Sequence, residues 1–149
     1  MTAKTDFRAD EWELIARGPA TAGLIAVTAQ RGGTFRETLA LTRAYVDARR
    51  AHGQSELLDE IVSAKPQLDR TRYDSPEDLR THGLQHLRDA VALVEQKATP
   101  EELDAYKRFT LDLAEKVASA HREDGDEAVS PSERAALDQI AEALGTTST

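Results

Sequence analysis

Three short motifs that begin helices constrain the fold of this chain most strongly. Thr34-Phe-Arg-Glu37, Thr99-Pro-Glu-Glu102 and Ser130-Pro-Ser-Glu133 each place a hydroxyl residue three positions before a Glu. In this arrangement the hydroxyl and the Glu carboxylate each accept a hydrogen bond from the other residue's backbone N–H. Ser75-Pro-Glu-Asp78 is a weaker version of the motif, with Asp in the last position. Four helices are therefore expected to begin at these sites.

Apolar residues between these starts recur with the period of an α-helix. Leu79, Leu87, Val91 and Val94 share one stripe, for example, and such a stripe needs a partner to cover it. No window alternates with period two for long enough to predict a sheet. We therefore expect an all-α protein, a compact antiparallel bundle of about six helices. The predicted helices cover 8–30 with a kink at Gly18-Pro19, 35–52, 56–65, 76–97, 100–121 and 131–144.

Length and composition limit the number of domains and the kinds of site that the chain can form. The chain has 149 residues, 40% of them apolar, which suits a single helical domain over 1–149 with a frayed tail at 146–149. It contains no Cys. Disulfides, thiolate metal sites and thiol catalysis are thereby excluded.

Charge and hydropathy favour a cytoplasmic protein that binds neither nucleic acid nor a membrane. The formal net charge is −8, and the Arg residues are interleaved with acids, so no basic stripe faces a phosphate backbone. The N-terminus lacks the apolar core and cleavage site of a signal peptide. The longest apolar-rich run, Ala20 to Ala29, is about half of what a membrane crossing requires.

The turn 123–133 is the strongest candidate for a functional site. Five acids lie within it, and Asp124, Asp126 and Glu133 could supply oxygen ligands to Ca²⁺ or Mg²⁺. The spacing differs from an EF-hand, because Ala128 and Ala135 stand where two ligands should be. The alternative interpretation is structural: Ser130 and Glu133 form a capping box at the last helix, and the other acids are solvated near a helix N-terminus that favours negative charge.

His82 and His86 form a second candidate site. They are four residues apart, so they lie one above the other on a helix, as two zinc-binding imidazoles would. Gly83 follows His82, so the Glu of the His-Glu-x-x-His protease motif is missing. The pair could serve a small metal-dependent enzyme or a ligand-binding protein, or it could belong to an ordinary polar stripe.

Arg70, Arg72 and Tyr73 lie in the longest predicted connection between helices. Two guanidinium groups beside an aromatic ring could bind an anionic protein partner. In the alternative interpretation Tyr73 anchors the loop to the bundle and the two Arg residues pair with nearby acids.

The C-terminal acidic loop and last helix resemble those of the TerB-like proteins associated with tellurite resistance. The resemblance is carried by Asp124-Gly125, Val129-Ser130, Glu133-Arg134, Ile140-Ala141 and Leu144-Gly145. It implies an all-helical, non-catalytic module that binds a divalent cation or a protein partner through the acidic turn. Asp124 and Glu133 would be its metal-associated acids, with Asp126 an addition of this sequence.

An earlier segment resembles the second loop of that family. Ala29-Gln-Arg-Gly-Gly-Thr-Phe-Arg-Glu37 shares its glycines and its Glu. Gln30 and Arg31 stand where the family would have an Asp. The resemblance therefore implies a loop that keeps the turn and loses the ligand.

Overall fold

The protein is an all-α bundle, as the sequence predicts. The computed structural model describes residues 6–28, 35–50, 56–63, 75–119 and 131–145. Within these residues the chain forms six helices and no strand: α1 Ala9–Thr28, α2 Phe35–Arg50, α3 Glu56–Val62, α4 Pro76–Lys97, α5 Pro100–Ser119 and α6 Pro131–Leu144. Each helix begins within a residue of its predicted start. The predicted ends at 30, 52, 65 and 121, and the predicted frayed tail at 146–149, lie outside the described residues.

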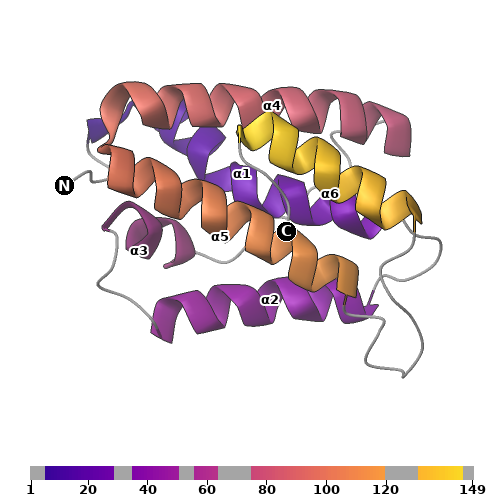
Figure 1. Cartoon of the computed structure of the whole chain (residues 1–149). Helices are drawn as coiled ribbons and strands as arrows, with labels where there is room; N and C mark the ends of the chain where they lie inside the picture. Colours follow the sequence, from indigo (N-terminus) through magenta and orange to yellow (C-terminus); the bar gives the residue numbers. More distant parts are fainter. Residues whose placement is uncertain (1–5, 29–34, 51–55, 64–74, 120–130, 146–149) are drawn as a thin grey trace.

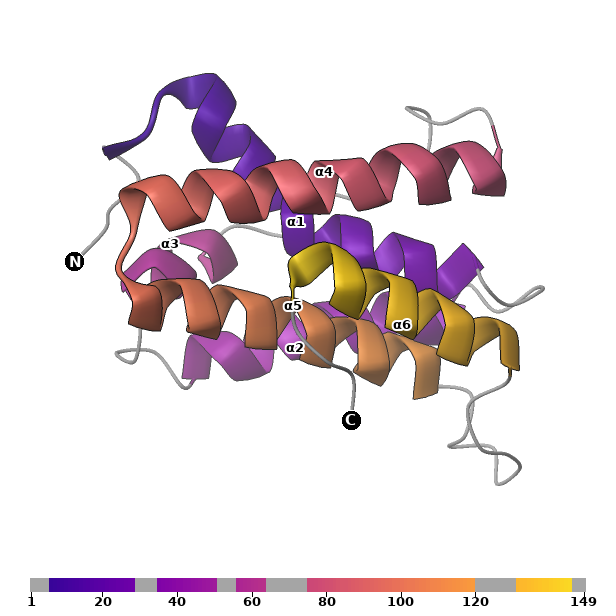
Figure 2. The same cartoon turned by 45° about the horizontal axis from the view of Figure 1, so that its top comes forward.

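Helix α1 is the central element of the bundle. It packs most extensively against α4 and α5 and also contacts α2 and α6 (Figure 1). The consecutive helices α4, α5 and α6 alternate in direction, whereas α1 and α5, which are far apart in the sequence, run the same way (Figures 1 and 2). The short helix α3 contacts α2 and α5.

The burial of α1 follows from its composition. Every residue from Gly18 to Ala26 is buried, including Ile25 with no exposed surface. A helix that is apolar on all sides is stable only where other helices surround it. Among the described residues, none of the helices is both long enough and apolar enough to cross a membrane.

Helix α1 changes direction along its length (Figure 2), and a side chain from α5 contacts its backbone at the internal Pro. Pro19 lies inside the helix and has no N–H, so the carbonyl of Ile15 loses its usual helical donor. The hydroxyl of Tyr106 donates to that carbonyl at 2.7 Å, and both groups are buried. Gly18 leaves the room for this contact, because a Cβ built there would stand 2.0 Å from the Tyr106 hydroxyl oxygen. The predicted kink at Gly18-Pro19 is therefore also a contact point between two helices.

Helix α4 approaches α1 closely at a second glycine. A Cβ at Gly83 would lie 3.0 Å from Ile25 Cδ1 and 3.1 Å from Thr21 Cγ2. The absence of a side chain at this position lets the two helices cross at short distance. Gly83 therefore has a packing role in α4.

The helix ends have the capping chemistry that the motifs predict. At α4 the Ser75 hydroxyl accepts from the Asp78 backbone N–H at 3.0 Å. At α5 the Thr99 hydroxyl accepts from the Glu102 N–H at 3.1 Å, and the Glu102 carboxylate accepts from the Thr99 N–H at 3.2 Å. After α6, Gly145 takes a positive φ of 76°, a usual way to end a helix. The capping hydroxyls of Thr34 and Ser130 lie outside the described residues.

Candidate interaction groove

The sequence-predicted cation and loop sites fall largely outside the described residues. This applies to Asp124 and Asp126 of the acidic turn and to Arg70, Arg72 and Tyr73 of the long connection. Glu133 lies in the first turn of α6, as its capping motif predicts. Their proposed roles remain predictions.

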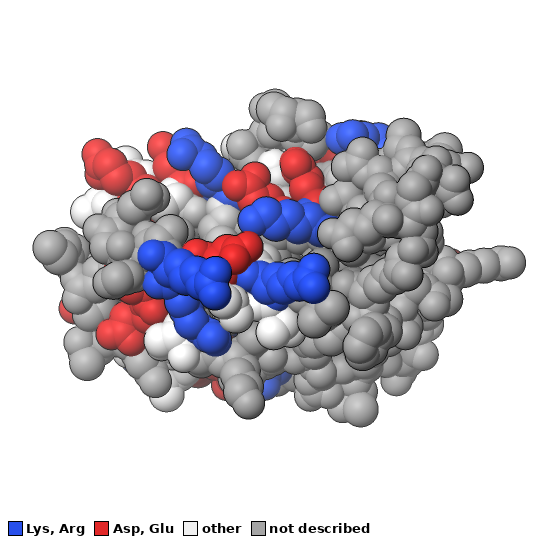
Figure 3. Space-filling view, turned by 90° about the horizontal axis from the view of Figure 1, so that it is seen from below, with Lys and Arg blue, Asp and Glu red and all other residues white. Residues whose placement is uncertain are grey.

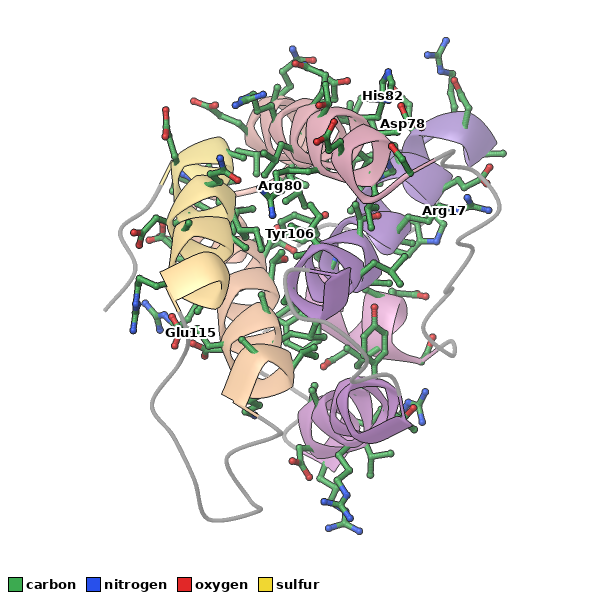
Figure 4. All side chains as sticks on the ribbon, turned by 90° about the vertical axis from the view of Figure 1, so that its right-hand side faces the viewer. Arg17, Asp78, Arg80, His82, Tyr106 and Glu115 are labelled. Carbon is green, nitrogen blue, oxygen red and sulfur yellow. The ribbon has the colours of Figure 1, made fainter. Side chains whose placement is uncertain are left out.

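His82 and His86 lie on successive turns of α4 but face different surroundings. His82 is exposed, and its Nδ1 contacts the carboxylate and the backbone carbonyl of Asp78 on the outer side of the helix (Figure 4). His86 is half-buried, and its Nε2 lies 2.8 Å from the carbonyl of Leu14 in α1. A carbonyl only accepts, so Nε2 carries the proton of this hydrogen bond and presents no lone pair to a metal. This geometry ties His86 to the α1 kink.

Three buried polar side chains of α5 likewise make hydrogen bonds to backbone or capping groups. The Thr110 hydroxyl donates to the carbonyl of Tyr106, and Glu102 accepts at the start of α5. Tyr106 lies inside the bundle (Figure 4), where burial raises the pKa of its hydroxyl far above the ordinary value. It therefore stays protonated and keeps donating to Ile15. These polar side chains, which could take part in catalysis elsewhere, here form hydrogen bonds with backbone groups of the helices.

A groove between α2, α3 and α5 is a concave site formed by described residues. Its volume is about 310 Å³, within the range of about 300–1,000 Å³ typical of ligand sites. Apolar side chains from all three helices form part of its lining: Ala44, Ala48, Leu58, Ala105, Phe109 and Leu113. Charged side chains complete it: Asp47, Asp59, Arg108, Asp112 and Lys116. The lining therefore combines apolar surface with charges of both signs, and both kinds of side chain occur in protein interfaces.

Phe109 is held in the groove by an aromatic neighbour. Its ring packs edge-on against Tyr45 of α2, with the ring centroids 5.7 Å apart. Tyr45 is 2% exposed, and burial raises the pKa of its hydroxyl well above the ordinary value. Phe109 is only partly buried and lines the groove. This arrangement gives the site a preformed aromatic surface.

Charges of both signs occur on the surface of the molecule. Acidic and basic side chains intermingle over the described part of the face seen from below (Figure 3). Burial raises the pKa of Glu115 above its usual value and the nearby Asp112 raises it further, while Arg134 of α6 opposes both effects. The outer surface of α5 is therefore electrostatically crowded.

The groove was not predicted from the sequence. Leu58 and Phe109 look like ordinary members of apolar stripes, and only the placement of α3 beside α2 and α5 leaves them partly uncovered. The signal in the sequence that could have pointed to a site on this helix is its charge pattern. Acids and bases alternate along α5 at intervals of four residues.

Comparison with known proteins found no similar protein. No protein-family model matches the chain, and neither the curated proteins nor the solved structures contain a match. Among the described residues, no group of three or more His, Asp or Glu side chains is placed to hold a metal ion.

Proposed function

We propose that this chain is a non-catalytic helical module that acts by binding a protein partner at the groove between α2, α3 and α5. The observation that carries the proposal is the groove itself, with Leu58 and Phe109 among its apolar lining residues and five charged side chains in the same lining. Covering the apolar side chains removes their surface from water, which supplies affinity, while the charged side chains select the orientation.

The hydrogen bonds made by three polar side chains support a binding role. Tyr106 and His86 donate to backbone carbonyls of α1, and Glu102 caps α5. Each of these side chains would have to leave a structural hydrogen bond before it could act on a substrate. The groove offers binding without such a rearrangement.

Indole tests whether the groove accepts an apolar anchor, because it reproduces the side chain of Trp, a frequent interface hot spot. In ¹H–¹⁵N correlation spectra, indole should shift the backbone amides of Ala48, Leu58 and Phe109. Ala48→Trp fills the groove from inside and should abolish these shifts. The exposed position Ala92 on α4 provides the control, since Ala92→Trp should leave them intact.

Ala105→Trp gives a second way to fill the groove if Ala48→Trp does not fold, as judged by its thermal unfolding. Shifts scattered over the surface, or shifts that survive both groove-filling variants, would refute the groove as a binding site.

The resemblance to TerB-like proteins carries a separate proposal, that the turn 123–133 binds Ca²⁺ or Mg²⁺ through Asp124, Asp126 and Glu133. A ligand of the native state stabilises it, by about 2.7 kcal/mol at 100 times the dissociation constant. Excess Ca²⁺ should therefore raise the thermal midpoint relative to chelator, and Asp126→Asn should reduce that rise. If Ca²⁺ leaves the midpoint of the parent protein unchanged, the cation proposal fails. If Asp126→Asn responds as the parent does, Asp126 is not a ligand.

A further inference from the structure

The outer face of α5 has four charged residues of alternating sign. Asp104, Arg108, Asp112 and Lys116 follow one another at intervals of four residues, and all four are exposed. Residues four apart lie one above the other on a helix, at intervals of about 6 Å along its axis. We refer to these four residues as the α5 charge stripe. Arg108, Asp112 and Lys116 also line the groove.

The ordinary explanation of such a pattern is a ladder of ion pairs within the helix. The structure has no such ladder. Among the described residues, Asp104, Arg108 and Asp112 form neither an ion pair nor a hydrogen bond through their side chains. These three exposed charges can pair with a second molecule at no cost in existing ion pairs, whereas Lys116 already has an interaction within the chain.

The order of signs identifies that molecule. Read in the reverse direction, the stripe is the complement of itself: Asp104 comes opposite Lys116, and Arg108 comes opposite Asp112. A second α5 helix crossing the first in the antiparallel direction has the same rise per residue, so each of the four positions comes nearest an opposite charge. The approach is closest for Arg108 and Asp112, because the stripe turns by about 40° around the helix axis at each step of four residues. A parallel helix in register would instead place equal charges together. Self-complementarity of this kind is the requirement for a two-fold symmetric interface.

We infer that the partner at this face is a second copy of the chain, docked with its α5 antiparallel to the first along the α5 charge stripe. The inference rests on the proposed function, because the stripe borders the groove proposed to bind a protein. Ala105 and Phe109, next to the stripe, supply apolar surface for the same contact.

The net charge of the chain makes this contact specific. Each copy has a formal charge of −8, so two copies repel each other in most orientations. The antiparallel arrangement matches four acid–base pairs and offsets that repulsion locally. Charges at the border of an interface select orientation more than they add affinity, so the expected dimer is weak and reversible.

Sedimentation velocity of the full chain at low salt measures the association directly. The parent protein should dimerise with rising concentration. Arg108→Asp places acids against Asp112 of the second copy, and Asp112→Arg places bases against Arg108. Each change acts twice per dimer, so each variant should dimerise at least about tenfold more weakly. Arg88→Asp, at an exposed position of α4, changes the net charge as Arg108→Asp does and should keep parental association.

Mixing the two weakened variants gives the decisive result. In the mixed pair every position of the stripe again meets an opposite charge, so Arg108→Asp and Asp112→Arg together should form a heterodimer although neither associates alone. The double variant Arg108→Asp/Asp112→Arg should also recover self-association. All changed side chains are exposed, and thermal unfolding checks that each variant folds.

Three results would overturn the inference: a parent protein that stays monomeric to about 1 mM at low salt, an Arg108→Asp variant that associates as Arg88→Asp does, or a mixture without heterodimer. These results are distinguishable from failure of the proposed function. A monomeric protein that binds indole in the groove refutes the second copy and retains the groove. A dimer that does not bind indole retains the stripe and refutes the anchor site.

Discussion

Replacing Gly18 by Ala is expected to destabilise the protein by about 2–6 kcal/mol, from overpacking of about 1–3 kcal/mol and the loss of a buried hydrogen bond worth a similar amount. The new methyl group would stand 2.0 Å from the Tyr106 hydroxyl oxygen, so the ring must move. Its movement leaves the carbonyl of Ile15 without the donor that replaces the missing N–H of Pro19. Urea unfolding followed by circular dichroism measures the change.

Tyr106→Phe provides the matched control for this prediction. Removing the hydroxyl deletes the atom that the new methyl group at position 18 would strike, and it also deletes the hydrogen bond. The double variant Gly18→Ala/Tyr106→Phe should therefore be more stable than the sum of the two single losses predicts. If the two losses simply add, the hydroxyl is not the atom that restricts position 18.

Leu87→Ala is expected to cost about 2–5 kcal/mol, the range for a fully buried Leu whose removal leaves a cavity. Leu87 has no exposed surface and lies in α4 within the central cluster of apolar side chains. Leu93→Ala, in the same helix, is the control because Leu93 is only partly buried. Its loss should be clearly smaller. Equal losses at the two positions would contradict the orientation of α4 in the bundle.

The starts of the helices could be read from the sequence because their causes are local. Ser75 and Thr99 accept hydrogen bonds from N–H groups three residues away, and Pro at the first helical position of α4 and α5 costs no bond there. Pro19 likewise predicted the kink, since the loss of its N–H is a property of the residue itself. Such contacts are present in any fold that contains the segment.

The partners of these elements could not be read in the same way. His82 and His86 are equivalent in the sequence pattern, yet His82 contacts Asp78 in its own helix while His86 reaches Leu14, which is 72 positions away in the chain. The hydrogen bond from Tyr106 to the carbonyl of Ile15 could not be predicted for the same reason, because it joins residues 91 positions apart.

The sequence by itself determined the helical class, the helix starts and the kink, whereas the tertiary structure decided what surrounds each helix. The run that begins at Ala20 reads as one apolar segment among several, and packing against α4 and α5 makes it the centre of the bundle. The groove beside Phe109 likewise exists only because α3 lies against α2 and α5. Capping and periodicity act within a few residues, but burial depends on which distant surfaces meet.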